Sequence, residues 1–123
     1  LLPYYKLYLF QYMTLNEIVD LMKSMASKMP RDQDKKYPIG LYIETKQYKM
    51  YKDNFGQNIA EILHQHLTDF GLETIEKNSH SIPIIIECFE REALEKYATL
   101  SDLPRVYLMD QNQMKDESLD EIS

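Results

Sequence analysis

The sequence predicts an α/β fold built on parallel strands, and three observations support this class. Helix-like and strand-like patterns alternate along the chain as helix, strand, helix, strand, helix, strand. Such alternation is typical of a parallel sheet with right-handed crossovers. Residues 40–46 (Gly-Leu-Tyr-Ile-Glu-Thr-Lys) form a short apolar strand pattern that ends in a carboxylate and an amine. Residues 83–86 (Pro-Ile-Ile-Ile) form a continuous β-branched run, which predicts a strand covered on both faces.

Length and composition restrict the class of protein. A chain of 123 residues is one domain or part of one. Its net charge of −6 opposes a nucleic-acid partner. Its single cysteine, Cys88, excludes an internal disulfide framework and a cysteine-rich zinc site. No apolar run approaches the ~20 residues of a membrane span. The chain starts with Leu-Leu-Pro and has no signal-peptide layout, so we interpret this start as a cut from a longer chain.

The first predicted element is a helix over residues 14–29. Thr14 and Glu17 match a capping box, and Pro30 ends the helix. We expect an apolar stripe of this helix in the core: Ile18, Met22, Met25 and Met29, with Val19 and Leu21 beside them. Residues 1–13 are rich in tyrosine and have no clean period. They are either a packed connecting segment or an aromatic wall beside a substrate headgroup.

The strand pattern of residues 40–46 divides its side chains between two faces. Glu44 and Lys46 fall on one face with Tyr42, opposite Leu41, Ile43 and Thr45. Two opposite charges at the end of a buried strand do not contribute to the packing of its core. A carboxylate can hold a hard metal ion, and an ammonium can contact a phosphate. On spacing alone, an ion pair without function explains the two residues equally well.

After this strand the sequence predicts a polar loop over residues 47–53 and a helix over residues 54–70. Asn54 is the expected N-cap of the helix, and Gly71 follows at the usual stop position. The expected apolar face consists of Ile59, Ile62, Leu63, Leu67 and Phe70. His64 and His66 lie about 200° apart around the helix, so they cannot share one metal from the same face. We expect His66 to be partly buried.

The last predicted elements repeat the alternation. The strand at residues 83–86 ends at Glu87, and Cys88 is expected to be a small buried residue. A helix over residues 90–100 follows, with Ala93, Leu94, Tyr97 and Ala98 pointing inward. Residues 106–109 form the third strand. Residues 110–123 are polar and acidic, and they form a loop with a weak helix or a frayed end.

Several of these segments resemble the glycerophosphodiester phosphodiesterases. Residues 40–46 are similar to the family's Gly-x-Tyr-x-Glu-Ile-Lys strand, with Thr45 in place of isoleucine. Residues 55–59 resemble the Gly-x-Asp-Ile helix start of the periplasmic-type members. Residues 86–90 resemble Leu-Gln-Cys-Phe-Asp, with Glu87 in place of glutamine, and residues 105–109 resemble the next strand. The similarity runs from about Met13 to about Met109, and its Glu-x-Lys piece is the most specific part.

This resemblance implies a fold, a reaction and site residues. The fold would be about three strands of a TIM (β/α)8 barrel, which needs about 250 residues in full. Residues 14–109 would form this β/α core, residues 1–13 a connecting segment and residues 110–123 a tail. The reaction would be hydrolysis of a glycerophosphodiester to glycerol 3-phosphate and an alcohol, with Ca²⁺ or Mg²⁺ as cofactor. Glu44 would be a metal ligand and Lys46 the catalytic residue that stabilises phosphoryl charge, while Lys46 and Phe89 would contact the substrate.

Other parts of the family's site have no match in this chain. The family's His-Arg-Gly strand, its Glu-x-Asp pair and its His-Asp pair all lie before the matching region. We therefore expect this piece alone to be inactive and to need the rest of the barrel upstream and downstream. Family membership would favour a periplasmic, secreted or luminal location. Two alternatives stay open: a non-catalytic binding or regulatory module derived from the same barrel, and an unrelated α/β domain with a coincidental Glu-x-Lys.

Overall fold

A computed structural model of the chain describes residues 13–28 and 39–116. The tyrosine-rich start, Met29 of the predicted stripe and the end of the acidic tail lie outside these residues. The elements follow in the order α2 (Leu15–Lys28), β1 (Leu41–Thr45), α3 (Tyr48–Phe55), α4 (Ile59–Phe70), α5 (Ile75–Asn78), β2 (Ile84–Cys88), α6 (Arg91–Leu100), β3 (Arg105–Tyr107) and α7 (Gln111–Asp116). No helix in the described ranges is long and apolar enough to cross a membrane.

The three strands form one sheet in the order β1-β2-β3, and both neighbouring pairs are parallel. This confirms the predicted α/β class with parallel strands. Each connection between neighbouring strands contains at least one helix, as parallel pairing requires. The carboxyl ends of β1 and β2 therefore lie at the same end of the sheet, where the register pairs Glu44 with Glu87 and Thr45 with Cys88.

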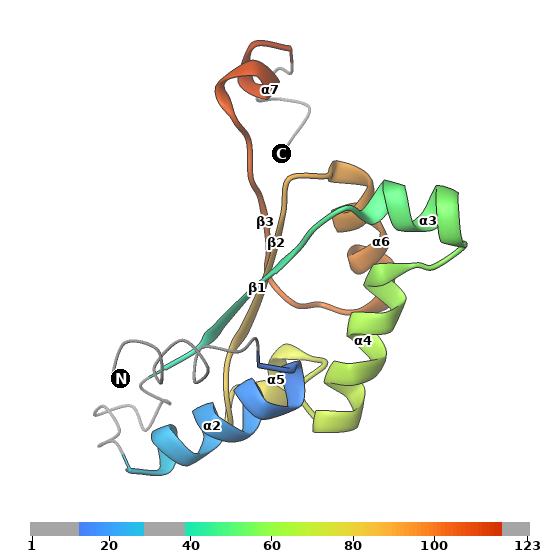
Figure 1. Cartoon of the computed structure of the whole chain (residues 1–123). Helices are drawn as coiled ribbons and strands as arrows, with labels where there is room; N and C mark the ends of the chain where they lie inside the picture. Colours follow the sequence, from blue (N-terminus) through green and yellow to red (C-terminus); the bar gives the residue numbers. More distant parts are fainter. Residues whose placement is uncertain (1–12, 29–38, 117–123) are drawn as a thin grey trace, which may run out of the picture.

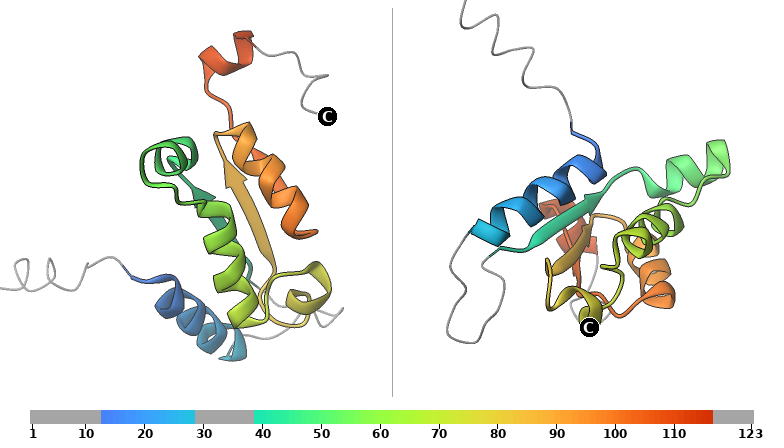
Figure 2. Two further views of the ribbon diagram at one scale, coloured as in Figure 1. Left: turned by 90° about the vertical axis from the view of Figure 1, so that its right-hand side faces the viewer. Right: turned by 90° about the horizontal axis from the view of Figure 1, so that it is seen from below.

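One face of the sheet is covered by helices. Figure 1 shows α3, α4 and α6 together on one side of the strands, and Figure 2 (left) looks onto α4 and α6 with β2 behind them. On this face Ile84, Ile86 and Cys88 are each at most 1% exposed. The inward positions Ala93, Leu94 and Tyr97 of α6 are confirmed, whereas Ala98 is exposed. The core therefore lies between β2 and these helices.

The other face of the sheet is open within the described residues. Ile85 and Glu87 alternate with the buried residues of β2 and are only half-buried. Beside them, Tyr42 on β1 is 61% exposed and Val106 on β3 is 37% exposed. The prediction that this β-branched run is covered on both faces is therefore wrong for the described part of the chain, because α3, α4 and α6 all pack on the opposite face.

Helix α2 begins with the predicted capping box. The Thr14 side chain accepts a hydrogen bond from the Glu17 backbone N–H at 3.2 Å, and the Glu17 carboxylate accepts one from the Thr14 backbone N–H at 3.2 Å. Its residue Val19 belongs to the hydrophobic core, against which Leu41 and Ile43 of β1 also pack. The predicted methionine stripe is only partly correct, because Val19 and Ala26 are buried while Met25 is 47% exposed. Val19 belongs to the core cluster, and Leu15 and Met22 pack against that cluster while partly buried.

The predicted helix over residues 54–70 is wrong at its start. The chain forms two helices there, and the predicted loop over residues 47–53 lies largely within the first of them, α3. Gly56 ends α3 in the left-handed conformation (φ 64°), which a glycine adopts without steric cost. The Asn58 side chain then caps α4 by accepting the Glu61 N–H at 3.1 Å. An asparagine therefore caps this helix as predicted, but the capping residue is Asn58 and not Asn54.

The apolar face of α4 also differs in part from the prediction. Leu63 and Leu67 are buried as expected, but Ile62 is 46% exposed. His66, expected to be partly buried, is exposed. Gly71 ends the helix as predicted, again with a positive φ of 72°.

Candidate functional site

The carboxyl end of β1 brings the two predicted charged side chains together. Lys46 Nζ lies 3.7 Å from Glu44 Oε2, with the Lys46 side chain 76% exposed and the Glu44 side chain 24% exposed. Glu87 stands opposite Glu44 in the strand register, on the same open face. The exposed Lys46 ammonium and two carboxylates therefore lie at the same end of the sheet.

One oxygen of the Glu44 carboxylate is in an ion pair but in no hydrogen bond with the described residues. Glu44 Oε2 is buried and accepts no hydrogen bond from any described residue. Its contact with Lys46 is longer than a hydrogen bond and is mainly an attraction between charges. Buried carboxylate oxygens normally have a donor or a cation beside them, and here the Lys46 ammonium is that cation.

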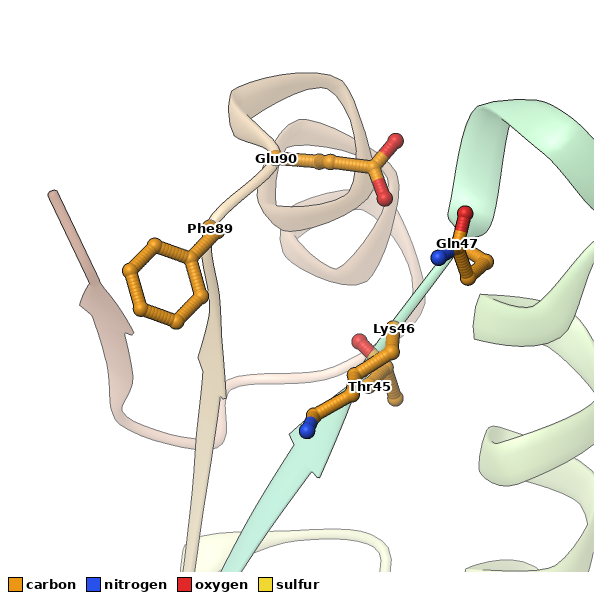
Figure 3. A pocket seen from close by; sticks show the side chains of 5 residues that line it. All are labelled: Thr45, Lys46, Gln47, Phe89 and Glu90. Atoms are coloured by element: carbon orange, nitrogen blue, oxygen red, sulfur yellow. The ribbon is translucent and has the colours of Figure 1, made fainter. Parts of the chain in front are cut away.

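A pocket of 340 Å³ opens between the ends of β1 and β2. Figure 3 shows its five lining residues: Thr45, Lys46, Gln47, Phe89 and Glu90. Two of them, Lys46 and Phe89, are the residues that the sequence proposed as substrate contacts. The Phe89 ring is 43% exposed, so the pocket offers an ammonium on one strand end and an aromatic surface on the other. Glu44 does not line the pocket itself and is linked to it through Lys46.

Sequence reasoning missed the part played by Glu90, which it placed only at the start of a helix. Glu90 Oε1 accepts the backbone N–H of Tyr48 at 2.8 Å, and Oε2 accepts that of Lys49 at 2.9 Å. Both donors belong to the first turn of α3, which contains no acidic residue of its own. The only signal in the sequence was an acidic residue directly after the second strand.

The residue between Lys46 and α3 has an unusual backbone. Gln47 has φ 62° and ψ 34°, and it is the one non-glycine residue with positive φ in the described part of the chain. A left-handed conformation costs about 1–2 kcal/mol for a residue with a Cβ. Its side chain makes no capping hydrogen bond. The turn is therefore held by its surroundings and not by its own residue.

Behind the pocket, the layer below Thr45 is buried and largely apolar. Cys88 is 0% exposed, as expected for a small buried residue, and its Sγ donates to the Thr45 carbonyl oxygen at 3.2 Å. Burial raises the pKa of the Tyr97 hydroxyl above its ordinary value. The Thr45 side chain partly opposes that shift in pKa without forming a hydrogen bond of standard geometry. Cys88 and Tyr97 are thus buried behind the pocket, whereas Thr45 lines it.

No histidine lies at the pocket. The chain has three histidines; His64 and His66 lie on α4, and His80 lies just before β2 at the amino end of the strand. Within residues 13–28 and 39–116, no group of three or more His, Cys, Asp or Glu side chains could hold a metal ion. The described site thus contains one lysine, acidic side chains and an aromatic ring, without an imidazole for proton transfer.

Comparisons with known proteins found no relative of this chain. No protein-family model, no curated protein and no solved structure matches the chain. The sequence pattern and the geometry at the ends of β1 and β2 are therefore the observations that bear on function.

Proposed function

We propose that this chain is part of a metal-dependent phosphodiesterase that hydrolyses glycerophosphodiesters to glycerol 3-phosphate and an alcohol. The observation that carries the proposal is the pair formed by Glu44 and Lys46 at the carboxyl end of a parallel strand. Their strand belongs to the segment with the resemblance to the glycerophosphodiester phosphodiesterases. In the proposal, the three parallel strands are one part of a TIM barrel, whose sites lie at this end of the strands.

The residues present fit a divalent cation only as a partial ligand set. Glu44 Oε2, buried and without a hydrogen-bond donor, is suited to be one oxygen ligand. Ca²⁺ takes six or more oxygens, so further ligands would come from outside the described residues. When bound, Ca²⁺ or Mg²⁺ would neutralise charge on the phosphate.

Two side chains have roles of their own in the proposed reaction. The Lys46 ammonium, exposed at the pocket, would stabilise negative charge on the phosphoryl oxygens. The Phe89 ring would contact the apolar side of the glycerol or alcohol part. Because no imidazole lies nearby, this chain assigns no residue to proton transfer.

The test is hydrolysis by the protein in its full natural length, with Ca²⁺ or Mg²⁺ varied. We expect Glu44→Gln to lower kcat/KM for glycerophosphodiesters at least about 100-fold, since ligand supporters alone are worth 10–100-fold. Lys46→Met should lower kcat by a similar factor. Glu61→Gln and Lys96→Met are matched controls, because these residues form a 3.1 Å ion pair between α4 and α6, away from the pocket. Equal activity of the Glu44 variant and the controls would refute the proposal.

A second measurement concerns the 123-residue chain alone. We expect it to show no micromolar affinity for Ca²⁺ by calorimetry and no hydrolysis, because one carboxylate is a poor site for a hard cation. Micromolar binding would mean that the ligand set is already complete in this chain.

The alternative function is a non-catalytic binding or regulatory module derived from the same barrel. The position of all three histidines away from the pocket favours it. In that case the full-length protein would bind a glycerophosphodiester without hydrolysing it, and Lys46→Met would weaken that binding. The coincidence hypothesis predicts neither binding nor hydrolysis. An antiparallel sheet would have supported coincidence, whereas the strands are parallel.

A further inference from the structure

The turn that carries Lys46 into α3 is held from the neighbouring strand. Gln47 is left-handed and makes no capping hydrogen bond of its own. The next two backbone N–H groups, of Tyr48 and Lys49, both donate to the Glu90 carboxylate. Figure 3 shows Glu90 reaching from the end of β2 toward the start of α3. One side chain thus connects the two strand ends on either side of the pocket.

The contact suits a carboxylate better than any other side chain. The first N–H groups of a helix lack partners within the helix and carry partial positive charge. A carboxylate can accept one donor on each oxygen, as Glu90 does at 2.8 and 2.9 Å. Glu90 makes no such contact with its own helix, because its side chain does not cap α6. The two backbone hydrogen bonds that its carboxylate accepts both come from the preceding β/α unit.

The backbone of Glu90 is itself fixed. Its N–H donates to Cys88 Sγ at 3.3 Å, and Cys88 Sγ donates to the Thr45 carbonyl at 3.2 Å. On the far side, the Tyr48 ring is 2% exposed, and its hydroxyl accepts a hydrogen bond from Asn58 at 3.1 Å. The carboxylate therefore joins two anchored segments, and the turn between them has little freedom.

We propose that Glu90 is a positioning residue that holds the left-handed turn at Gln47 and so keeps Lys46 at the pocket wall, where it contacts a phosphate group. The phosphate part of this inference rests on the proposed function. Without the carboxylate, Gln47 relaxes to an ordinary backbone conformation and the first turn of α3 frays. Lys46, one residue earlier, then changes the direction of its side chain.

The first experiment does not depend on any activity. Amide hydrogen exchange is measured in the chain and in Glu90→Ala, Glu90→Gln and Glu92→Gln. Glu92 is the matched control, because it lies in the first turn of α6 and bonds Lys52 of α3 at 2.5 Å, but it accepts no backbone N–H of the turn. We expect Glu90→Ala to lower the protection of the Tyr48 and Lys49 amides about 10-fold or more, relative to the Leu67 amide of α4. Glu90→Gln, with a single acceptor oxygen, should retain the protection of one of the two amides.

Two outcomes would overturn the inference at this stage. The first is unchanged protection of Tyr48 and Lys49 in Glu90→Ala. The second is an equal loss at Leu67 in both Glu90 variants, which would mean that the residue only supports the fold. The Glu92→Gln control should leave the Tyr48 and Lys49 amides as they are in the natural chain.

The second experiment is a double-mutant cycle in the full natural-length protein, with glycerophosphodiester hydrolysis as the readout. If Glu90 acts through Lys46, Glu90→Ala lowers kcat/KM about 10–100-fold in the natural background and less than about 2-fold in the Lys46→Met background. Equal effects in both backgrounds would contradict the positioning role. Absence of hydrolysis by the natural protein would refute the proposed function, while the exchange experiment would still decide whether Glu90 holds the turn.

Discussion

The two faces of the sheet differ although the same three strands form both of them. On the face toward α3, α4 and α6, the β2 side chains Ile84, Ile86 and Cys88 are almost fully buried. On the other face, Tyr42 and Val106 remain exposed, beside the half-buried carboxylates of β1 and β2. The described chain thus completes one face by itself and leaves apolar surface on the other.

Along β1, the residues that stabilise the core and the residues of the candidate site lie on opposite faces of the sheet. Neighbouring residues have different surroundings, because successive side chains of a strand point to opposite faces of the sheet. Thr45 lies in the buried layer, whereas its neighbours Glu44 and Lys46 carry the charges of the candidate site. A parallel sheet normally has both faces covered, whereas the described residues cover only one face of this sheet.

The largest expected effect compares neighbouring isoleucines of β2. Ile86→Ala should lower the free energy of unfolding by about 2–5 kcal/mol, because the buried side chain leaves a cavity. Ile85→Ala, on the open face, should cost less than about 1 kcal/mol in the 123-residue chain, since its side chain keeps part of its exposure when folded. Urea unfolding of both variants measures the difference. Equal losses would mean that the open face is covered in solution.

A smaller effect concerns the ion pair between Glu73 and Lys77 and its contribution to stability as the pH changes. The side chain of Lys77 bonds Glu73, which is 7% exposed, and this contact lowers the pKa of Glu73. A lowered pKa in the folded state stabilises the protein above the ordinary carboxyl pKa, and this stabilisation is lost as the pH falls through the lowered value. Unfolding measured from neutral pH into the acid range should therefore show a slope that Glu73→Gln reduces. An unchanged slope in that variant would assign it to other groups.

The smallest effect concerns the buried hydroxyl behind the pocket. Tyr97 is 3% exposed, and its hydroxyl oxygen forms no hydrogen bond with a described residue. Tyr97→Phe removes this unsatisfied group and leaves the ring in place, so the free energy of unfolding should change by less than about 1 kcal/mol, in the stabilising direction. Thermal unfolding of the variant checks the sign. A clear loss of stability would indicate a partner for the hydroxyl.

The sequence predicted those parts of the fold that depend on local pattern. The alternation of helices and strands, the Thr14 capping box and the stop at Gly71 can all be read from neighbouring residues. The start of α4 could not be placed, because Asn54 and Asn58 are both good caps and the choice depends on where Gly56 ends α3. Gly56 ends α3 in a left-handed conformation, and the next helix therefore starts after Asn58 and not after Asn54.

The candidate site was predicted in the same uneven way. The closeness of Glu44 and Lys46 follows from strand period alone. Glu90 contacts Tyr48 and Lys49 of α3, which precede it in the sequence by 42 and 41 positions, so no local pattern contains these contacts. Nor does glutamine signal a left-handed residue, a conformation for which glycine or asparagine is usual. The unpredicted parts of the site are thus those that arise between two β/α units.

The glycine before β1 has a consequence for how this strand begins. A Cβ on Gly40 would lie 3.1 Å from the carbonyl oxygen of Pro83, which accepts the Leu41 N–H at 2.8 Å. A side chain at this point would therefore make the Pro83 carbonyl move by a few tenths of an ångström, at the hydrogen bond that first joins the two chain segments. The lack of a side chain at Gly40 lets the chain enter β1 directly against the start of β2.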